Sequence, residues 1–272
     1  MRLGILVNAY ARTFQLEACL SSVLAASNDF ECERLVVHQL GVPESTQISE
    51  KFKDFFNVDY VNPIGTNAVQ RINHTRVMGL AKLFEHNEID AVLAIEDDIE
   101  IARDSVNYCM KILKKFESDR KFRGINLGSR IPKINNDEFL RSYSLIRYGL
   151  HGQAGLITRD TWRKIKWWKL INNEDSGFDA KIEAYLKTGF MVTPNCSRYL
   201  DCGYDSLATH AVRNPQHDDF VLNRESFVGR DFWPNPNGYL LSQQEHLVWR
   251  KDAVSYQKIQ NLEYWQIGRA HV

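Results

Sequence analysis

The chain has 272 residues, of which 44% are hydrophobic and 25% are charged, a composition typical of a folded protein and not of a disordered one. Its 34 basic residues balance its 34 acidic residues. Nothing in this balance argues for a nucleic-acid-binding stripe or a polybasic membrane surface, so we expect any anionic ligand to be held by a local site.

The first half of the chain alternates strand-like and helix-like segments. Continuous apolar runs predict strands, and apolar residues three and four positions apart predict helices. In chain order we expect a strand over 3–7, a helix over 16–26, a strand over 35–37, a helix over about 44–56, a strand over 58–61, a helix over 68–84, a strand over 91–95 and a helix over 104–116. Strands buried on both faces that alternate with helices predict an α/β fold with a mostly parallel central sheet flanked by helices.

The second half has a mixed pattern. We expect strands near 125–127, 145–150 and 190–192, a short helix near 161–165 and a helix over 178–186. From residue 213 onward the chain is rich in Asn, Pro and aromatic residues and has weak periodicity. That composition is typical of a lid or an acceptor loop.

Cysteine usage and the N-terminal sequence bear on the compartment. The five cysteines are scattered, odd in number and without a C-x-x-C pair: Cys19, Cys32, Cys109, Cys196 and Cys202. They predict reduced thiols in a cytoplasmic protein. The apolar run over 3–7 is too short for a signal-peptide core or a transmembrane segment. We therefore expect a soluble chain that is at most peripherally attached to a membrane.

Three adjacent carboxylates, Glu96, Asp97 and Asp98, directly follow the apolar strand predicted over 91–95. In open α/β sheets, ligands bind beyond the carboxyl ends of the strands. Adjacent carboxylates repel one another, and Mg2+ or Mn2+ would relieve that repulsion, because these cations prefer carboxylate and phosphate oxygens. The alternative is an acidic turn that caps the next helix. A solvated turn, however, does not need a core strand before it.

A second acidic position, Asp179, opens the helix predicted over 178–186. An Asp in the first turn of a helix is commonly only a favourable partner of the helix dipole. It could also be the general base that takes the proton of an acceptor hydroxyl. Glu174 and Asp175 compete for that role.

Four further residues are candidates for phosphate or metal binding. Guanidinium groups suit phosphate oxygens, so Arg12 and Arg76 could hold a diphosphate, although each could equally be an ordinary surface arginine. Arg198 or His210 could reach phosphate or metal, but a single histidine near a strand end is more commonly structural.

On these residues the chain resembles the GT-A glycosyltransferases, and among them the N-acetylglucosaminyltransferase I family, which extends N-glycans. The resemblance runs from about residue 3 to residue 210, and its most specific piece is the stretch over 96–104. The other matching pieces are the opening through Cys19 and Leu20, the region of Gln39, the segment from Arg71 to Phe84, residues 149–157 with Trp162, Phe178 with Asp179, and residues 197–210.

The resemblance implies an inverting enzyme with a GT-A fold and a DXD-type metal motif. It would transfer N-acetylglucosamine or a similar hexose from a UDP-sugar to a hydroxyl acceptor, such as a glycan, with Mn2+ or Mg2+ as cofactor. By this resemblance Asp98 would be the direct metal ligand, Asp97 and Glu96 would contact the ribose or a metal-bound water, and Asp179 would be the catalytic base. From the residues themselves, His210 is a further candidate metal ligand. The nucleotide-sugar would be bound by Asn8, Arg12, Gln39, Arg76, Glu96, Asp97 and Arg198.

Three features depart from that family. Leu40 stands beside Gln39 where the family has an acid near the uracil, and Phe178 and Ala180 replace a tryptophan pair that flanks the base. The membrane anchor of the eukaryotic members is missing from the sequence. These departures bear on the nucleotide base and the sugar more than on the fold or the metal.

The predicted organisation is one GT-A domain over residues 1–225, with a nucleotide-binding half over 1–100 and an acceptor or catalytic half over 101–225. A C-terminal lid or tail would follow over 226–265. Residues 266–272 (QIGRAHV) read like the translation of a common sequencing adapter. We expect them to be non-native and leave them out of the functional interpretation.

Three other functions compete with this one. A sugar nucleotidyltransferase shares the sheet but needs a glycine-rich phosphate loop after the first strand, where this chain has residues 8–12 without a glycine. We reject it for that reason. A retaining glycosyltransferase of the same fold and a non-catalytic module that binds a nucleotide-sugar remain as alternatives.

Overall fold

The computed structural model describes residues 1–40, 43–128, 143–146, 150, 153–165, 167, 188–194, 197–202 and 239–241. Several predicted positions lie outside these ranges, namely Glu174, Asp175, Asp179, Cys196, His210 and the helix predicted over 178–186. The predicted tail over 226–265 also lies outside them, apart from three residues that form a strand.

The eight elements predicted for the first half are all confirmed. They are β1 (Arg2–Ala9), α1 (Thr13–Ser27), β2 (Cys32–Gln39), α2 (Pro43–Glu50), β3 (Asn57–Val61), α3 (Ala68–Glu85), β4 (Ile89–Glu96) and α4 (Ser105–Phe116). Helix α2 ends earlier than predicted. Beyond it, the N–H groups of Lys51 and Phe52 bond to the carbonyls three residues back, at 3.0 and 2.9 Å. This tighter spacing ends the α-helix.

The second half contributes β6 (Phe122–Asn126), β7 (Tyr143–Ile146), β8 (Ala154–Thr158), α6 (Arg159–Lys164), β9 (Phe190–Pro194), β10 (Tyr199–Asp201) and β11 (Tyr239–Leu241). Four strands were not predicted: β8, β10, β11 and the short β5 (Ile99–Ile101). Each has only three to five residues. The three-residue strands β5, β10 and β11 give too few repeats for a period to be recognised.

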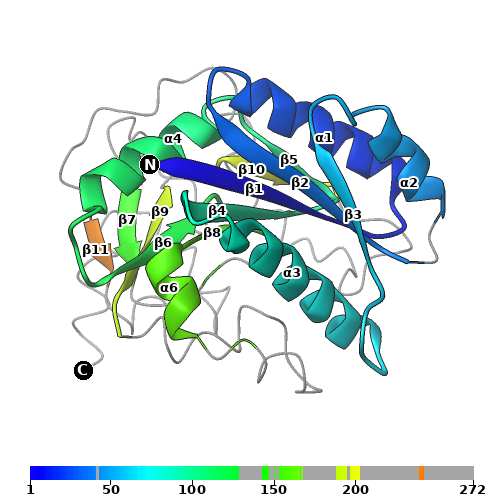
Figure 1. Cartoon of the computed structure of the whole chain (residues 1–272). Coiled ribbons are helices and arrows are strands. Elements are labelled where there is room, and N and C mark those ends of the chain that lie inside the picture. The colour runs from blue at the N-terminus through cyan, green and yellow to red at the C-terminus, as the bar shows by residue number, and fades with distance from the viewer. Residues whose placement is uncertain are drawn as a thin grey trace, which may run out of the picture.

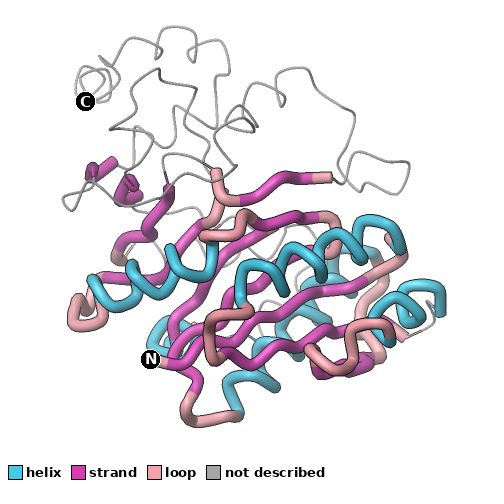
Figure 2. The backbone as a smooth tube through the Cα atoms, turned by 90° about the horizontal axis from the view of Figure 1, so that it is seen from above, coloured by secondary structure: helices cyan, strands magenta, loops and turns pink. Residues whose placement is uncertain are grey.

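The strands form a nine-stranded sheet in the order β11-β7-β9-β6-β8-β4-β1-β2-β3, beside a two-stranded sheet of β10 and β5. Strands β1, β2, β3 and β4 run parallel, and β8 lies antiparallel between β4 and β6. Helices α1, α2 and α4 cover one face of the large sheet, and α3 and α6 cover the other (Figure 1). Figure 2 shows the strands side by side beneath helices that run along them.

The pleat of β1 explains how both faces become core. Ile5, Val7 and Ala9 belong to the hydrophobic cluster that includes α1 and α4. Leu6 points the other way, toward α3, where a Cβ at Gly79 would lie 2.6 Å from a Leu6 methyl carbon. Glycine at this position lets α3 approach the sheet closely. Because β1 to β4 are parallel, their carboxyl ends meet along one edge of the sheet.

Two expectations about the chain's environment can be compared with the structure. Of the described cysteines, Cys19, Cys32 and Cys109 are free thiols as predicted, and the Cys202 thiol donates to Glu100 Oε1 at 3.3 Å. Among the described residues, no helix is both long enough and apolar enough to cross a membrane.

Candidate functional site at the carboxyl ends of the parallel strands

The three acids lie where β4 ends and the chain turns into β5. Backbone hydrogen bonds hold this turn from two directions: the Glu96 N–H donates to the Gln153 carbonyl at 2.9 Å, and the Asp98 carbonyl accepts from the Cys202 N–H at 2.8 Å. The segments that provide these partners come from the second half of the chain. The acidic turn is therefore a fixed part of the fold and not a solvated loop.

Asp97 and Asp98 face the loop between β1 and α1. The Tyr10 backbone N–H donates to Asp97 Oδ2 at 2.7 Å. Arg12 Nη1 donates to Asp98 Oδ2 and lies 3.7 Å from Asp97 Oδ1. Asp97 and Asp98 are only 4% and 7% exposed. Burial raises the pKa of Asp97 to about 6, because desolvation outweighs the Tyr10 hydrogen bond and the charge of Arg12.

Glu96 faces the opposite side of the sheet, toward α3. Arg76 of α3 donates from Nη2 to Glu96 Oε1 at 2.6 Å, and Arg76 is only 3% exposed. Asn8 of β1 stands in register with Glu96. Asn8 is buried, with only 8% of its surface exposed. Even so, neither polar atom of its side chain has a hydrogen-bond partner in the described part of the chain. A buried amide with unused donor and acceptor capacity suits a ligand.

The amino-terminal half of α3 buries polar side chains that the sequence analysis did not single out. Asn73 and His74 are buried beside Arg76, whereas further along α3 the buried residues include Leu80 and Leu83. Burial lowers the pKa of His74, and its Nδ1 has no partner among the described residues. The missed signal was a helical face whose apolar positions give way to polar ones toward the sheet's carboxyl-end edge.

Two clusters thus result from the predicted residues. Asn8, Arg76 and Glu96 gather on the α3 side, and Arg12, Asp97 and Asp98 gather on the α1 side. Gln39, the last residue of β2, is buried at the same edge. It lies two residues beyond Val37, whose methyl group faces Gly79 of α3, so alternation places it on the α3 side.

Arg198 makes its contacts elsewhere. Its Nε lies 3.0 Å from Asp104 Oδ2, and its guanidinium lies 5.9 Å from the Tyr108 ring centroid. Its backbone N–H donates to Leu127 and its carbonyl accepts from Ala102. The charge of Arg198 therefore serves the packing of α4, and these contacts favour a structural role over phosphate binding.

The donor set of the acidic turn fits a hard divalent cation. Within the described ranges, no group of three or more His, Cys, Asp or Glu side chains could hold a metal ion. The turn does offer two adjacent, buried carboxylates that already hold one positive group, Arg12. Mg2+ and similar cations are commonly bound by one or two carboxylates together with substrate phosphates. Asp97 and Asp98 match that arrangement.

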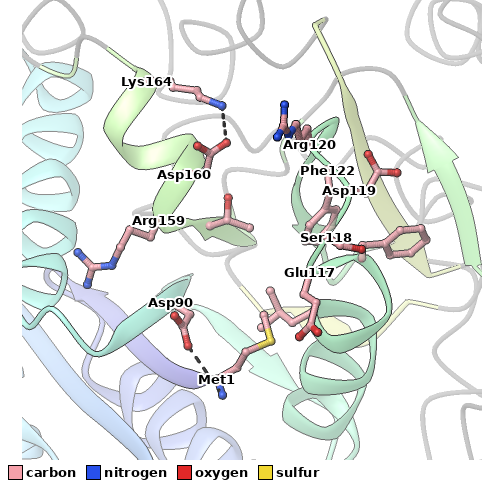
Figure 3. A pocket seen from close by; sticks show the side chains of 13 residues that line it. Met1, Asp90, Glu117, Ser118, Asp119, Arg120, Phe122, Arg159, Asp160 and Lys164 are labelled. Carbon is pink, nitrogen blue, oxygen red and sulfur yellow. Dashed lines mark hydrogen bonds and ion pairs between the residues drawn. The ribbon is translucent and has the colours of Figure 1, made fainter.

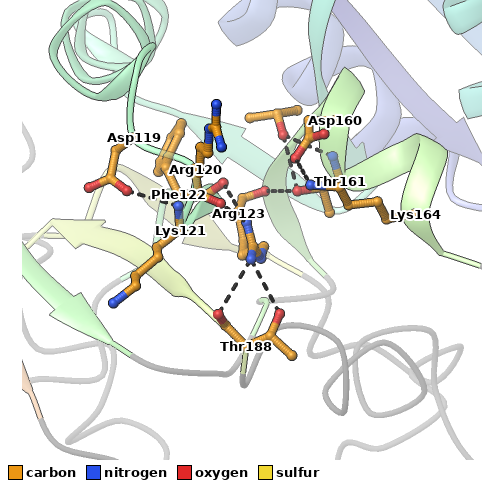
Figure 4. A network of polar contacts seen from close by, with 10 residues as sticks. Asp119, Arg120, Lys121, Phe122, Arg123, Asp160, Thr161, Lys164 and Thr188 are labelled. Atoms are coloured by element: carbon orange, nitrogen blue, oxygen red, sulfur yellow. Dashed lines mark hydrogen bonds and ion pairs between the residues drawn. The ribbon is translucent and has the colours of Figure 1, made fainter.

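A hollow of about 560 Å3 lies at the opposite, amino-end edge of the sheet (Figure 3). Its charged lining includes Asp90, Glu117, Arg159 and Lys164. Beside it, Arg123 donates to the Arg120 carbonyl at 2.7 Å, and the Thr161 hydroxyl donates to the Arg123 carbonyl at 2.7 Å (Figure 4). The second of these bonds ties α6 to β6. Because ligands of open α/β sheets bind at the carboxyl ends of the strands, this hollow is not the candidate site.

Comparison with known proteins supports the fold. No family model and no curated protein matches the sequence. Among solved structures, Staphylococcus aureus TarS 1–349 in complex with UDP-GlcNAc matches with a TM-score of 0.52 and 15% identity, over 98% of this chain and 79% of that one. The mannosyltransferase PcManGT from Pyrobaculum calidifontis, in complex with GDP-Man and Mn2+, matches with a TM-score of 0.51 and 14% identity, over 98% and 73%. The chain has the GT-A fold. It spans 61% and 36% of two further TarS structures.

Proposed function

We propose that this chain is a metal-dependent glycosyltransferase that transfers N-acetylglucosamine or a similar hexose from a UDP-sugar to a hydroxyl acceptor with inversion. The observation that carries the proposal is the buried acidic turn Glu96–Asp98, with an arginine on each side, at the carboxyl end of β4. Solved structures of the same fold hold UDP-GlcNAc, or GDP-Man with Mn2+. These complexes support nucleotide-sugar use here.

In this proposal the cluster on the α1 side binds the cation, and the cluster on the α3 side binds the nucleoside. A cation held by Asp98, with Asp97 beside it, would stabilise the charge that develops on the leaving nucleoside diphosphate. On the α3 side, Arg76 orients Glu96, and the Asn8 amide offers one donor group and one acceptor to the nucleoside. Burial favours the neutral imidazole of His74. In that form the ring has one hydrogen-bond donor and one acceptor for a ligand at the same edge.

For the catalytic base we propose Asp179, following the resemblance to the N-acetylglucosaminyltransferase I family. It would take the proton of the acceptor hydroxyl on the face of the sugar opposite the leaving diphosphate. A positioned carboxylate contributes about 100- to 10,000-fold to such a step. Asp179→Asn should therefore lower turnover by about 100-fold or more and leave UDP and Mn2+ affinity near wild type. Glu174→Gln and Asp175→Asn are the controls and should have milder effects. If Asp175→Asn is inactive while Asp179→Asn keeps its activity, the catalytic base is Asp175.

Nucleotide binding can be tested without knowledge of the acceptor. Thermal unfolding is measured with UDP or GDP, each with Mn2+ and with excess EDTA. A nucleotide at about 100 times its Kd should stabilise the chain by about 2.7 kcal/mol, and only when the cation is present. Equal stabilisation in EDTA would remove the metal from the proposal. If the chain binds a nucleotide-sugar but neither hydrolyses it nor transfers the sugar, a non-catalytic module is favoured. If the sugar in the product keeps its anomeric configuration, a retaining enzyme is favoured.

A further inference from the structure

Arg12 lies between the two carboxylates that the proposed function assigns to the metal. Its Nη1 atom donates to Asp98 Oδ2 and lies 3.7 Å from Asp97 Oδ1. The side chains of Arg12, Asp98 and Asp97 are 13%, 10% and 6% exposed, respectively. Adjacent carboxylates repel each other strongly in so dry a place, and a guanidinium keeps its charge at every physiological pH. Arg12 therefore provides the positive charge that a divalent cation would otherwise provide.

The position of Arg12 in the chain allows that charge to move. The residue is the N-cap of α1, its backbone is extended, and its carbonyl accepts from the Leu16 N–H at 3.2 Å. The backbone is thus fixed, while the guanidinium stands at the end of a long side chain with several rotatable bonds. Arg76 differs, because it starts from the middle of α3 and is almost fully buried against Glu96.

We infer that Arg12 is a displaceable counter-charge that yields its place to a divalent cation when the cation arrives with a nucleoside diphosphate. This inference rests on the proposed function. Once displaced, the guanidinium turns to the diphosphate oxygens, which it can bind with two parallel hydrogen bonds. A cation that arrives alone must displace the guanidinium and offers it no phosphate in return. Cation and nucleotide therefore bind cooperatively, and each raises the affinity of the other by the same factor.

The test is a Mn2+ titration of the full chain, followed by the electron paramagnetic resonance of free Mn2+, with and without saturating UDP. In the wild type, UDP should raise Mn2+ affinity by about tenfold or more. In Arg12→Gln, Mn2+ alone should bind about tenfold more tightly than in the wild type, because no guanidinium competes for the carboxylates. UDP should then add less than about threefold, because the group that couples the two ligands is gone.

Two variants serve as controls. Arg76→Gln also removes a positive charge beside the acidic turn, so it measures the general electrostatic effect, and we expect it to raise Mn2+ affinity by less than about threefold. Arg12→Lys keeps the charge but lacks the two-pronged geometry. It should leave the affinity for Mn2+ alone near wild type and weaken the coupling to UDP, and it keeps the inference testable if Arg12→Gln does not fold.

Each outcome decides a different point. If Arg12→Gln binds Mn2+ no more tightly than the wild type, while the wild type binds Mn2+ and UDP cooperatively, the displacement is wrong and the proposed function stands. An equal gain in Arg76→Gln would reduce the effect to general electrostatics and overturn the inference. If the wild type binds no UDP with any divalent cation, the proposed function itself fails.

Discussion

The two edges of the central sheet carry ion pairs of the same length in different surroundings. The nitrogen–oxygen distance is 2.6 Å in Arg76–Glu96 at the carboxyl-end edge, and also in Arg2–Glu88 and Lys164–Asp160 at the amino-end edge. The Arg76 side chain is 3% exposed, whereas the side chains of Arg2 and Glu88 are 34% and 62% exposed.

Burial, and not distance, decides what an ion pair contributes. Exposed pairs contribute about 0 to 1 kcal/mol, because water and salt screen them. A buried charge must keep a partner, and removal of that partner costs about 3 to 5 kcal/mol when both groups are fully buried. The charges at the carboxyl-end edge are therefore dependent on one another and on any charged ligand, while those at the amino-end edge act almost independently.

The largest expected difference between the edges concerns the metal. Asp98→Asn should lower Mn2+ affinity in the presence of UDP by more than about 100-fold, because loss of an outer-shell group already costs about 10- to 100-fold. Glu96→Gln should cost less, since Arg76 and not the cation holds Glu96. Asp160→Asn, at the amino-end edge, should bind like the wild type. Mn2+ titration of the three variants is the measurement, and equal losses in Asp98→Asn and Glu96→Gln would contradict the assignment.

The next effect is a pair of opposing pH dependences at the carboxyl-end edge. His38 of β2 is buried between the hydroxyls of Ser45 and Ser49, at 3.2 and 2.7 Å, and burial lowers its pKa from 6.5 to about 4. The unfolded chain therefore binds a proton that the folded chain does not, and stability falls as the pH drops from 6.5 toward 4. Asp97, with its pKa raised to about 6, has the opposite effect: it favours the folded state as the pH falls through 6.

Urea unfolding at pH 7 and pH 4.5 can separate these contributions. On going from pH 7 to pH 4.5, the free energy of unfolding of His38→Gln should rise by about 2 kcal/mol relative to that of the wild type. For Asp97→Asn it should fall by about 2 kcal/mol relative to the wild type. The double variant should resemble the wild type, and Asp160→Asn should follow it as the exposed control. Parallel pH profiles for all the variants would mean that neither group is shifted as described.

A smaller effect should distinguish the two arginines that form pairs of equal length. Arg76→Gln should lower the free energy of unfolding by about 1.5 kcal/mol, which is less than for a fully buried pair because Glu96 is 31% exposed. Arg2→Gln should cost less than about 1 kcal/mol. Urea unfolding at low and high salt provides the check, because only the exposed pair should weaken with salt. If Arg2→Gln costs as much as Arg76→Gln, burial is not the deciding factor.

The smallest effect is expected for Lys164→Gln. Its partner Asp160 lies one helical turn earlier in α6, and both side chains are about half exposed. Such a pair contributes about 0.3 to 0.5 kcal/mol, so the melting temperature should shift by no more than about 2 °C for a chain of this size. A larger loss would indicate that the hollow beside α6 depends on this contact.

The sequence by itself determined the first half of the fold and the place of the acidic turn. Apolar runs and helical spacing are local patterns, and in β1 to β4 they are long enough to be recognised. Because parallel strands end at one edge, the sequence alone places a carboxylate cluster after the 91–95 run at the carboxyl-end edge of the sheet. The strand β8 could not be predicted in the same way, because its five residues acquire their antiparallel place only from β4 and β6.

Only the tertiary structure decided which partner each arginine received. Arg12, Arg76 and Arg198 were equal candidates for phosphate in the sequence, yet they pair with Asp98, Glu96 and Asp104. Arg12 and Asp98 are 86 positions apart, far beyond the reach of a period of 2 or 3.6 residues. The pleat of the sheet and the docking of α1, α3 and β10 bring these charges together. The physical reason is that local patterns encode which face of an element is buried, but not which distant charge that face will meet.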